Sequence, residues 1–282
     1  MRPRRRDRLV RAIIPAAGRG TRLRPLSLAV AKELLPAGDV PMIERAVREA
    51  VEAGIRDVCV VLRRGKEAIA QHLAACGAIP GCRLTYRWQA RPLGMGHAVF
   101  CARDFAADAP FLLLIPDQFL LGPVQASRRL VERYGFGTPT ILSSLVRMPG
   151  REVRFFPGAR GLAVAARDWP ALLRGMPVPV RRLLKGMAGH RDRRHLRITG
   201  FGRTIYPPEV FPFLSARYRN PATGEVDLWE TFRALPDSIA HRAVLLPGRP
   251  VDLGTLDGYR RYLPKFFRGP EPGWAGTPRG LR

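Results

Sequence analysis

The sequence predicts an α/β fold with a mixed, mainly parallel central sheet. Over about the first 120 residues, short apolar runs of strand length alternate with longer segments whose apolar residues recur at helical spacing. Several of the runs are apolar throughout, which is typical of parallel strands that helices cover on both faces. Such alternation of strand and helix is the pattern of βαβ units in a doubly wound sheet.

The first apolar run, residues 9–15, predicts a buried strand, and a Gly-rich loop follows at 16–22. An irregular stretch then extends to Asp39, which can cap a helix that continues to Gly54. The remaining elements expected before residue 120 are a strand at 57–62, a helix at 66–75, a strand at 83–88, a short helix at 96–102 and a strand at 111–115.

The second half of the chain has weaker patterns. We expect strands at 139–146, 196–206 and 243–246, and helices at 207–215, 225–235 and 256–267. After residue 146, Pro, Gly and Arg dominate as far as 195, and no period is firm there. We expect residues 1–267 to form a single domain, whereas residues 268–282, rich in Gly, Pro and Arg, form a loose basic tail.

The chain is strongly basic, with 48 Lys and Arg residues against 23 Asp and Glu and a net charge of +25. This excess is compatible with a polyanionic partner such as nucleic acid or an acidic membrane surface. It is also compatible with a compositional bias, because Ala, Gly and Pro are abundant too. The arginines are scattered and no motif of a nucleic-acid-binding module occurs, so we favour the bias and expect no specific nucleic-acid partner.

No apolar run approaches the roughly 20 residues that a membrane span requires, and residues 1–11 lack the apolar core of a signal peptide. The cysteine spacings match neither a C-x-x-C pair nor a zinc site. We therefore expect a cytoplasmic protein that does not bind membranes.

The Gly-rich loop is the first candidate for chemistry. It leaves a buried strand, and open α/β sheets bind ligands at the carboxyl ends of their strands. Small residues let the backbone N–H groups approach a triphosphate, and Arg22 supplies positive charge. The loop lacks the Gly-Lys-Ser/Thr of a P-loop, and Leu23 replaces the third Gly of a dinucleotide fingerprint. Taken alone, such a loop is structural about as often as functional. The candidate nucleotide-binding residues are Ala16, Ala17, Gly18, Gly20 and Thr21.

Lys32 lies ten residues after Arg22, and it is one of only four lysines in the chain. A lysine is a compact charge suited to a phosphate, although a lone lysine is more often a solvated surface residue. Together, the Gly-x-Gly-Thr-Arg of the loop and the Lys-Glu-Leu-Leu-Pro segment at 32–36 resemble the signature of the sugar-1-phosphate nucleotidyltransferases. With Pro-Ala-Ala before the first Gly, the motif most resembles the bacterial UTP–glucose-1-phosphate uridylyltransferases. The resemblance implies a Rossmann-like nucleotide-diphospho-sugar transferase fold and gives Arg22 and Lys32 catalytic roles.

The segment Gln-Ala-Arg-Pro-Leu-Gly-Met-Gly-His-Ala at 89–98 follows a predicted strand and opens a helix. The resemblance implies that Gln89 and Gly94 contact the pyrimidine base. An amide both donates and accepts hydrogen bonds, as a pyrimidine edge requires. We interpret His97 as a packed residue at a helix start rather than as a catalyst.

Asp117 follows the apolar run at 111–115, and Asp252 lies in the segment Val-Asp-Leu-Gly-Thr at 251–255. Each could also be an ordinary turn residue. Carboxylate oxygens suit Mg²⁺, a hard cation. The resemblance makes both aspartates ligands of a catalytic Mg²⁺, with Asp117 also counted as catalytic, and it makes a nucleoside triphosphate and a sugar 1-phosphate the substrates.

The match to the family is good over residues 10–120, moderate over 196–263 and absent between them. The family has a Glu-Lys-Pro there whose lysine holds the sugar phosphate, whereas this chain has Lys185-Gly186-Met187. We expect Lys185 to take this catalytic role or the function to be lost. Gly200 is expected near the sugar. The implied division is a nucleotide-binding part at about 9–135 and a sugar-binding part at about 136–267, with homo-oligomers possible.

Three alternatives remain open at this point. The same chemistry could use dTTP or CTP, and a panel of nucleotides would decide between them. The chain could be a catalytically impaired homologue that binds nucleotides and regulates. The net charge alone suggests a nucleic-acid-binding protein.

Overall fold

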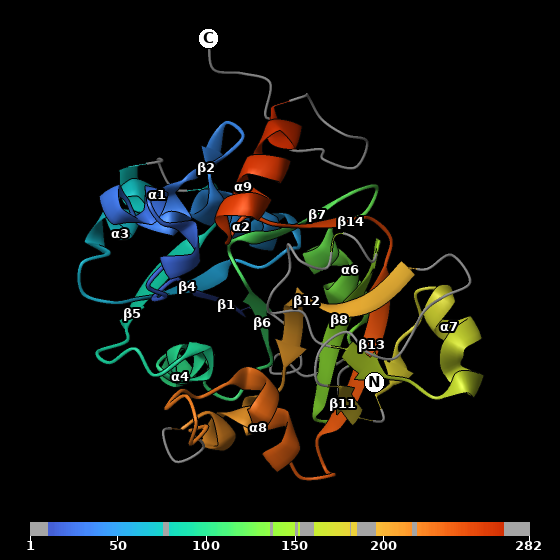
Figure 1. The fold of residues 1–282 in the computed structure, drawn as a ribbon. Helices are drawn as coiled ribbons and strands as arrows, with labels where there is room; N and C mark the ends of the chain where they lie inside the picture. The colour runs from blue at the N-terminus through green and yellow to red at the C-terminus, as the bar shows by residue number, and fades with distance from the viewer. Residues whose placement is uncertain are drawn as a thin grey trace.

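The computed structural model describes residues 11–75, 79–135, 138–149, 152, 161–180, 182–184, 196–215 and 219–267 (Figure 1). Its centre is an eight-stranded sheet with the strand order β10-β13-β8-β12-β6-β1-β4-β5. The bounds of these strands are β1 Arg11–Pro15, β4 Asp57–Leu62, β5 Arg83–Trp88, β6 Phe111–Leu114, β8 Thr140–Pro149, β10 Val178–Pro179, β12 Leu196–Tyr206 and β13 Ala240–Leu246.

The sheet is mixed but mainly parallel, as predicted. The pairs β1–β4, β1–β6, β4–β5 and β8–β13 are parallel. The pairs β12–β6, β12–β8 and β10–β13 are antiparallel. Because β1, β4, β5 and β6 are parallel, their carboxyl ends meet at one edge of the sheet, where the segments that follow them are brought together.

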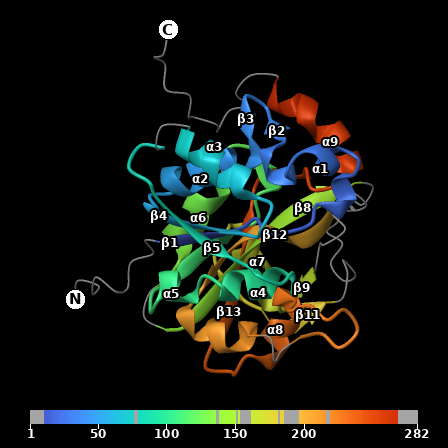
Figure 2. The ribbon, with the colours of Figure 1, turned by 90° about the vertical axis from the view of Figure 1, so that its left-hand side faces the viewer.

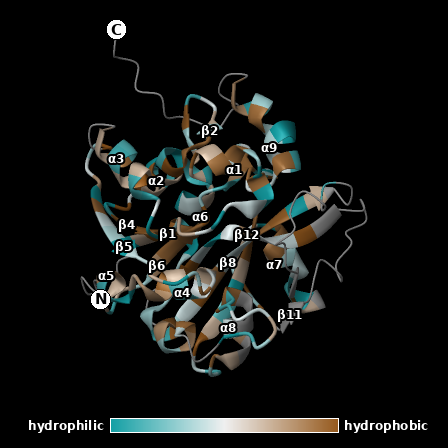
Figure 3. Ribbon diagram, turned by 60° about the vertical axis from the view of Figure 1, so that its left-hand side comes forward, coloured by the Kyte–Doolittle hydropathy of each residue, from teal (hydrophilic) through white to brown (hydrophobic). Residues whose placement is uncertain are grey.

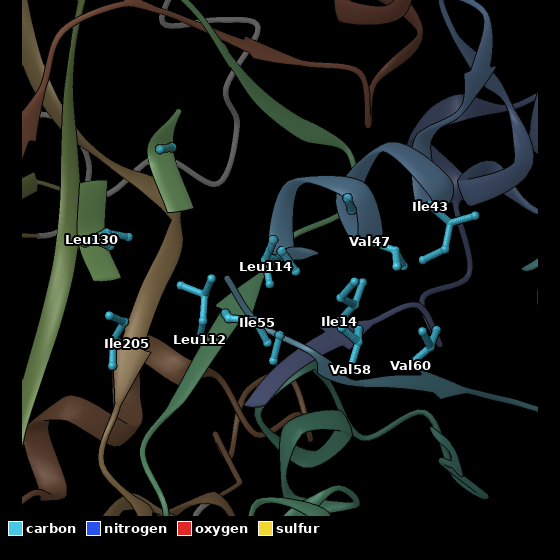
Figure 4. Close-up of a cluster of buried hydrophobic side chains, with 14 of the residues drawn as sticks. Ile14, Ile43, Val47, Ile55, Val58, Val60, Leu112, Leu114, Leu130 and Ile205 are labelled. Atoms are coloured by element: carbon cyan, nitrogen blue, oxygen red, sulfur yellow. The ribbon is translucent and has the colours of Figure 1, made fainter. Parts of the chain in front are cut away.

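Helices cover both faces of the sheet (Figures 1 and 2). On one side lie α2 (Met42–Glu52), α3 (Glu67–Ala75) and α6 (Ala126–Arg133), and on the other α4 (Met95–Phe100), α5 (Arg103–Ala106) and α8 (Leu228–Ala234). Alternation along β1 supplies both cores, because Ile14 packs with the α2 side and Ile13 with the α4 side. Figure 4 shows the first core, in which Ile14, Val47 and Leu112 pack closely. Figure 3 shows hydrophobic residues gathered along the central strands.

A third apolar cluster lies beyond the carboxyl edge of the sheet. There β7 (Gln118–Leu121) pairs in antiparallel fashion with β14 (Arg249–Asp252). This ribbon packs with α9 (Leu256–Tyr262) and with the 3-10 helix η8 (Leu263–Phe266). The pairing joins the segment after β6 to a segment 128 to 134 residues further along the chain.

The remaining elements are short, and they surround the sheet. They are η2 Thr21–Leu23, α1 Leu26–Ala29, η3 Lys32–Leu34, β2 Pro36–Ala37, β3 Val40–Pro41, β9 Gly161–Ala163, η5 Ala166–Asp168, α7 Trp169–Leu173, β11 Arg182–Leu184 and η6 Pro208–Leu214. Within the described ranges, no helix combines the length and the apolar character that crossing a membrane demands.

Two expected helices differ from the structure. The segment at 207–215 is the 3-10 helix η6, because Pro207, Pro208 and Pro212 cannot donate backbone hydrogen bonds. The last helix ends at Tyr262 instead of 267, since Pro264 interrupts it and η8 follows. The expected tail at 268–282 lies outside the described residues, and the division into two parts stays a prediction.

Candidate functional site

The Gly-rich loop begins directly at the end of β1. Ala16 and Ala17 are buried, and the Ala16 N–H donates to Val61 O of the neighbouring strand at 2.8 Å. Gly18 and Arg19 are exposed at the sheet edge. The loop therefore starts at the carboxyl end of β1, as predicted, and then turns outward to the surface.

Gly20 enables the turn that follows. Its φ is +72°, in the left-handed region that side-chain-bearing residues rarely adopt. Its carbonyl accepts a hydrogen bond from Ser27 Oγ at 2.7 Å, and η2 begins at Thr21. Arg22 lies in η2 and is exposed. The loop thus presents its arginine side chains to solvent at the carboxyl edge of the sheet.

Lys32 and Asp117 form an ion pair at this edge. The Lys32 ammonium donates to Asp117 Oδ2 at 2.5 Å, and the side chains are only 14% and 6% exposed. Burial alone would raise the pKa of Asp117, but the charge and hydrogen bond of Lys32 hold it below the ordinary value. Burial likewise disfavours the charged Lys32, yet the carboxylates of Asp117 and Glu33 raise its pKa.

Asp252 reaches the same place from the ribbon β7–β14, where it lies opposite Gln118. The Leu253 N–H donates to the backbone carbonyl of Asp117 at 2.8 Å. A Cβ on Gly254 would lie 2.9 Å from Asp252 Oδ1 and still closer to Asp117 Oδ2. The two carboxylates therefore converge on one point beside the Gly254 backbone, and only a glycine leaves them room.

The two aspartates titrate differently although they are neighbours. Burial, and then the negative charge of Asp117, raise the pKa of Asp252 to about 7. Two hydrogen bonds orient its carboxylate, from Gly254 N–H at 2.7 Å and from Gln118 Nε2 at 3.3 Å. Asp117 disfavours the charged form of Asp252, so a cation beside the two carboxylates would favour ionisation of both.

Gln89 follows β5 at the same edge, and its backbone N–H continues the ladder to Leu62 O at 2.7 Å. Its side chain is buried and donates to Gly94 O at 3.0 Å, with His97 Nδ1 at 3.1 Å. Burial lowers the pKa of His97, which suits a neutral ring that accepts this bond. Both N–H donors of the Gln89 amide are thus already used within the protein.

Gly94 has a packing role that sequence reasoning did not foresee. Its φ is +91°, and a Cβ there would lie 2.8 Å from Glu225 Cβ and 2.9 Å from Val226 O. The segment 225–226 therefore closes against the loop that precedes α4, and Val226 N donates to Leu93 O at 2.7 Å. A contact of Gly94 with a base stays a prediction.

The expected sugar-side residues are described only in part. Gly200 lies in β12 opposite Leu145, where the pairing with β8 becomes irregular toward Thr204. Lys185 lies outside the described residues, so its role stays a prediction.

Lys66 and Glu33 form a buried ion pair under the Gly-rich loop that the sequence did not reveal. The Lys66 ammonium donates to Glu33 Oε2 at 2.6 Å and to Ala16 O at 2.7 Å. Burial lowers the pKa of Lys66 in spite of Glu33. The rarity of lysine in this chain was the one signal that could have marked Lys66.

Among the described residues, no group of three or more His, Cys, Asp or Glu side chains could hold a metal ion. The candidate metal site is the pair Asp117 and Asp252.

Comparison with known proteins agrees with the motifs and the fold. Residues 11–141 match the family model described as nucleotidyl transferase. A UTP–glucose-1-phosphate uridylyltransferase of Bacillus subtilis is 29% identical over 269 residues, which cover 88% of each chain. The enzyme of the same name from Klebsiella pneumoniae is 28% identical over 279 residues and 89% of each chain.

Solved structures show the same fold. A UTP-bound UGPase from Acinetobacter baumannii superposes with a TM-score of 0.73 at 22% identity, covering 94% of this chain and 96% of that one. A UDP-glucose pyrophosphorylase complexed with UDP-glucose gives 0.74 at 20% identity, covering 92% and 99%. These matches agree with the resemblance inferred from the motifs: residues 11–141 fit the nucleotidyl transferase family model, and similarity to UTP–glucose-1-phosphate uridylyltransferases extends over 88% of the chain.

Proposed function

We propose that this protein condenses UTP with a sugar 1-phosphate, glucose 1-phosphate in the first instance, to give a UDP-sugar and pyrophosphate. The observation that carries the proposal is the convergence of Asp117 and Asp252 beside Lys32 at the sheet edge where the Gly-rich loop begins. The names of the relatives in Bacillus subtilis and Klebsiella pneumoniae support the choice of UTP and glucose 1-phosphate.

The residues at the edge fit a divalent cation, for which Mg²⁺ is the natural choice. Both carboxylates are buried, both offer oxygen, and the charge of one raises the pKa of the other. Asp117 and Asp252 would hold the ion through Oδ2 and Oδ1, the atoms that point at Gly254. When bound, the ion would supply positive charge to the phosphate oxygens.

The chain would act by positioning and by neutralising charge. An oxygen of the sugar phosphate attacks the α-phosphorus in line, and the bond to the leaving pyrophosphate breaks. This oxygen is already anionic, so no side chain has to remove a proton. The backbone N–H groups of the Gly-rich loop and the exposed Arg22 would hold the triphosphate. Lys32 would turn from Asp117 toward a phosphate oxygen.

A nucleotide and sugar panel tests the proposal. Pyrophosphate release is measured with UTP, dTTP, CTP, ATP and GTP, each with glucose, galactose and mannose 1-phosphates. We expect turnover with UTP and glucose 1-phosphate to exceed the other pairs. Preference for dTTP or CTP would redefine the nucleotide, whereas UTP binding by calorimetry without pyrophosphate release would make the protein a binding homologue.

A further inference from the structure

A third buried ion pair, between Arg203 and Glu49, lies beneath the candidate metal site. Arg203 of β12 is fully buried, and its guanidinium meets Glu49 of α2 with two parallel bonds, Nε to Oε1 at 2.8 Å and Nη2 to Oε2 at 2.6 Å. Ser127 Oγ donates to the same carboxylate at 2.5 Å. Glu49 cancels the charge of the guanidinium, so Arg203 adds little field to its surroundings.

The same guanidinium also donates hydrogen bonds to the turn that carries Asp117. Its Nη1 donates to Ile115 O at 2.9 Å, and its Nη2 donates to Gln118 O at 2.7 Å. These two carbonyls flank Asp117 on either side. The rigid fork of an arginine can bridge them, whereas the single ammonium of a lysine cannot do so in the same plane.

The turn is also tied to Asp252. A Cβ on Gly202 would lie 2.6 Å from Gln118 Oε1 and 2.8 Å from Ile115 Cβ, so β12 lies directly against the turn. The other end of the Gln118 amide donates to Asp252 Oδ2 at 3.3 Å. The buried Arg203 guanidinium thus holds the turn on both sides of Asp117, at the carbonyls of Ile115 and Gln118. The Gln118 side chain connects the same turn to Asp252.

We propose that Arg203 is a positioning residue that holds the turn 115–118 so that Asp117 and Asp252 converge on a divalent cation. This inference rests on the proposed function, since it takes the two carboxylates to be ligands. It assigns Arg203 a role in cation affinity that burial in the core alone would not give it.

The test measures Mn²⁺ affinity by electron paramagnetic resonance, with and without UTP, beside thermal unfolding. Arg203→Lys keeps a cation for Glu49 but loses the fork. The double variant Glu49→Leu/Arg203→Met removes the ion pair without leaving a buried charge, which favours retention of the fold. Ile205→Ala is the matched control, because Ile205 is fully buried two residues further along the same strand (Figure 4).

We expect both Arg203 variants to weaken Mn²⁺ binding by about tenfold or more, as is usual when the support of a metal ligand is lost. Ile205→Ala should lower the melting temperature but leave Mn²⁺ affinity within about twofold, because its cavity does not reach the ligands.

Equal loss of Mn²⁺ affinity in Ile205→Ala, or normal affinity in the folded double variant, overturns the positioning role while the proposed function stands. A wild-type chain that neither binds Mn²⁺ nor releases pyrophosphate overturns both. Wild-type turnover together with the expected split among the variants supports both.

Discussion

At the scale of single residues, the candidate site depends on two carboxylates that occupy one point. The chain stabilises them in different ways: the ammonium of Lys32 balances Asp117, whereas hydrogen bonds from Gly254 and Gln118 hold Asp252. The glycine at 254 is required because a Cβ would collide with both carboxylates. Because the carboxylates act through their charge, we expect that replacing one by an amide of the same shape abolishes turnover.

Asp117→Asn is expected to reduce UTP-dependent pyrophosphate release by at least about 10²–10³-fold, because an amide has no charge to hold a cation or to pair with Lys32. The fold should survive, since the amide has nearly the same volume. Steady-state kinetics and a thermal melt measure the two effects. Asp104→Asn is the control, as that side chain is 71% exposed, and near-normal turnover in Asp117→Asn would remove the metal role.

At the scale of elements, the buried pair Lys66–Glu33 connects the loop after β4, the η3 segment that carries Lys32, and the carbonyl of Ala16. Both side chains are almost fully buried, at 4% and 1% exposure. A buried pair of this kind adds little stability overall, but removal of one partner leaves the other charge uncompensated. The pair therefore holds the start of the Gly-rich loop in place, but the substitution of either partner alone should destabilise the fold.

Lys66→Met should lower the free energy of unfolding by about 3–5 kcal/mol, because Glu33 would remain buried without its cation. The double variant Glu33→Gln/Lys66→Met should recover part of this loss, and urea titration measures both. Arg83→Met provides the comparison: its pair with Asp57 is exposed and should cost about 0–1 kcal/mol. If Lys66→Met and Arg83→Met lowered the free energy of unfolding equally, the structural role of the buried pair would be contradicted.

The strand β13 carries a histidine that makes folding depend on pH. Burial lowers the pKa of His241 from 6.5 to about 4, and its ring contacts Ser143 Oγ at 2.9 Å and stacks on Phe232. Between these two pKa values the unfolded chain binds more protons than the folded one. The free energy of unfolding is therefore highest above pH 6.5, where His241 is neutral in both states. It decreases as the pH falls toward 4, because the unfolded chain takes up the proton first.

Urea titrations at pH 7.5, 6, 5 and 4.5 should show this loss, on the order of 2–3 kcal/mol across the window. His241→Gln keeps a polar partner for Ser143 but does not titrate, so its free energy of unfolding should vary less with pH over the same range. If the free energy of unfolding varied equally with pH in the wild type and in His241→Gln, His241 would not be the cause of the pH dependence.

The sequence predicts well those strands whose own residues carry the pattern. The strands β4 and β5 and the long strand β12 begin and end where their sequences predict. The sequence does not predict the ribbon β7–β14, because its strands are only four residues long and pair across 128 to 134 residues of chain. The helix predicted at 207–215 is a 3-10 helix instead, and Pro212 inside it cannot donate the backbone hydrogen bond of an α-helix.

The sequence offers candidate site residues one by one, but it does not show the network of contacts that surrounds them. Asp117 and Asp252 were found by resemblance, and each alone could have been a turn residue. The partners that hold them, Arg203 and Gln118, carry no sequence signal, because a buried arginine in a chain with so many arginines looks like any other. Which arginine faces the core is decided only when β12 packs against α2.

At the scale of the whole molecule, the parallel strands gather at one edge four segments that are far apart in the sequence: the Gly-rich loop, the segment from Gln89, the turn at Asp117 and the strand end at Asp252. The chain as a whole carries a net charge of +25, and a positive field favours the approach of phosphates. Such a field also predicts weak binding of nucleic acid that disappears as salt is raised, rather than sequence-specific recognition.

Anomalous diffraction from crystals grown with UTP and Mn²⁺ tests the central claim most directly. The account predicts one strong manganese peak within coordination distance of both Asp117 and Asp252, next to the triphosphate at the Gly-rich loop. A peak that contacts neither carboxylate, or a nucleotide bound elsewhere with the two aspartates unliganded, would contradict it.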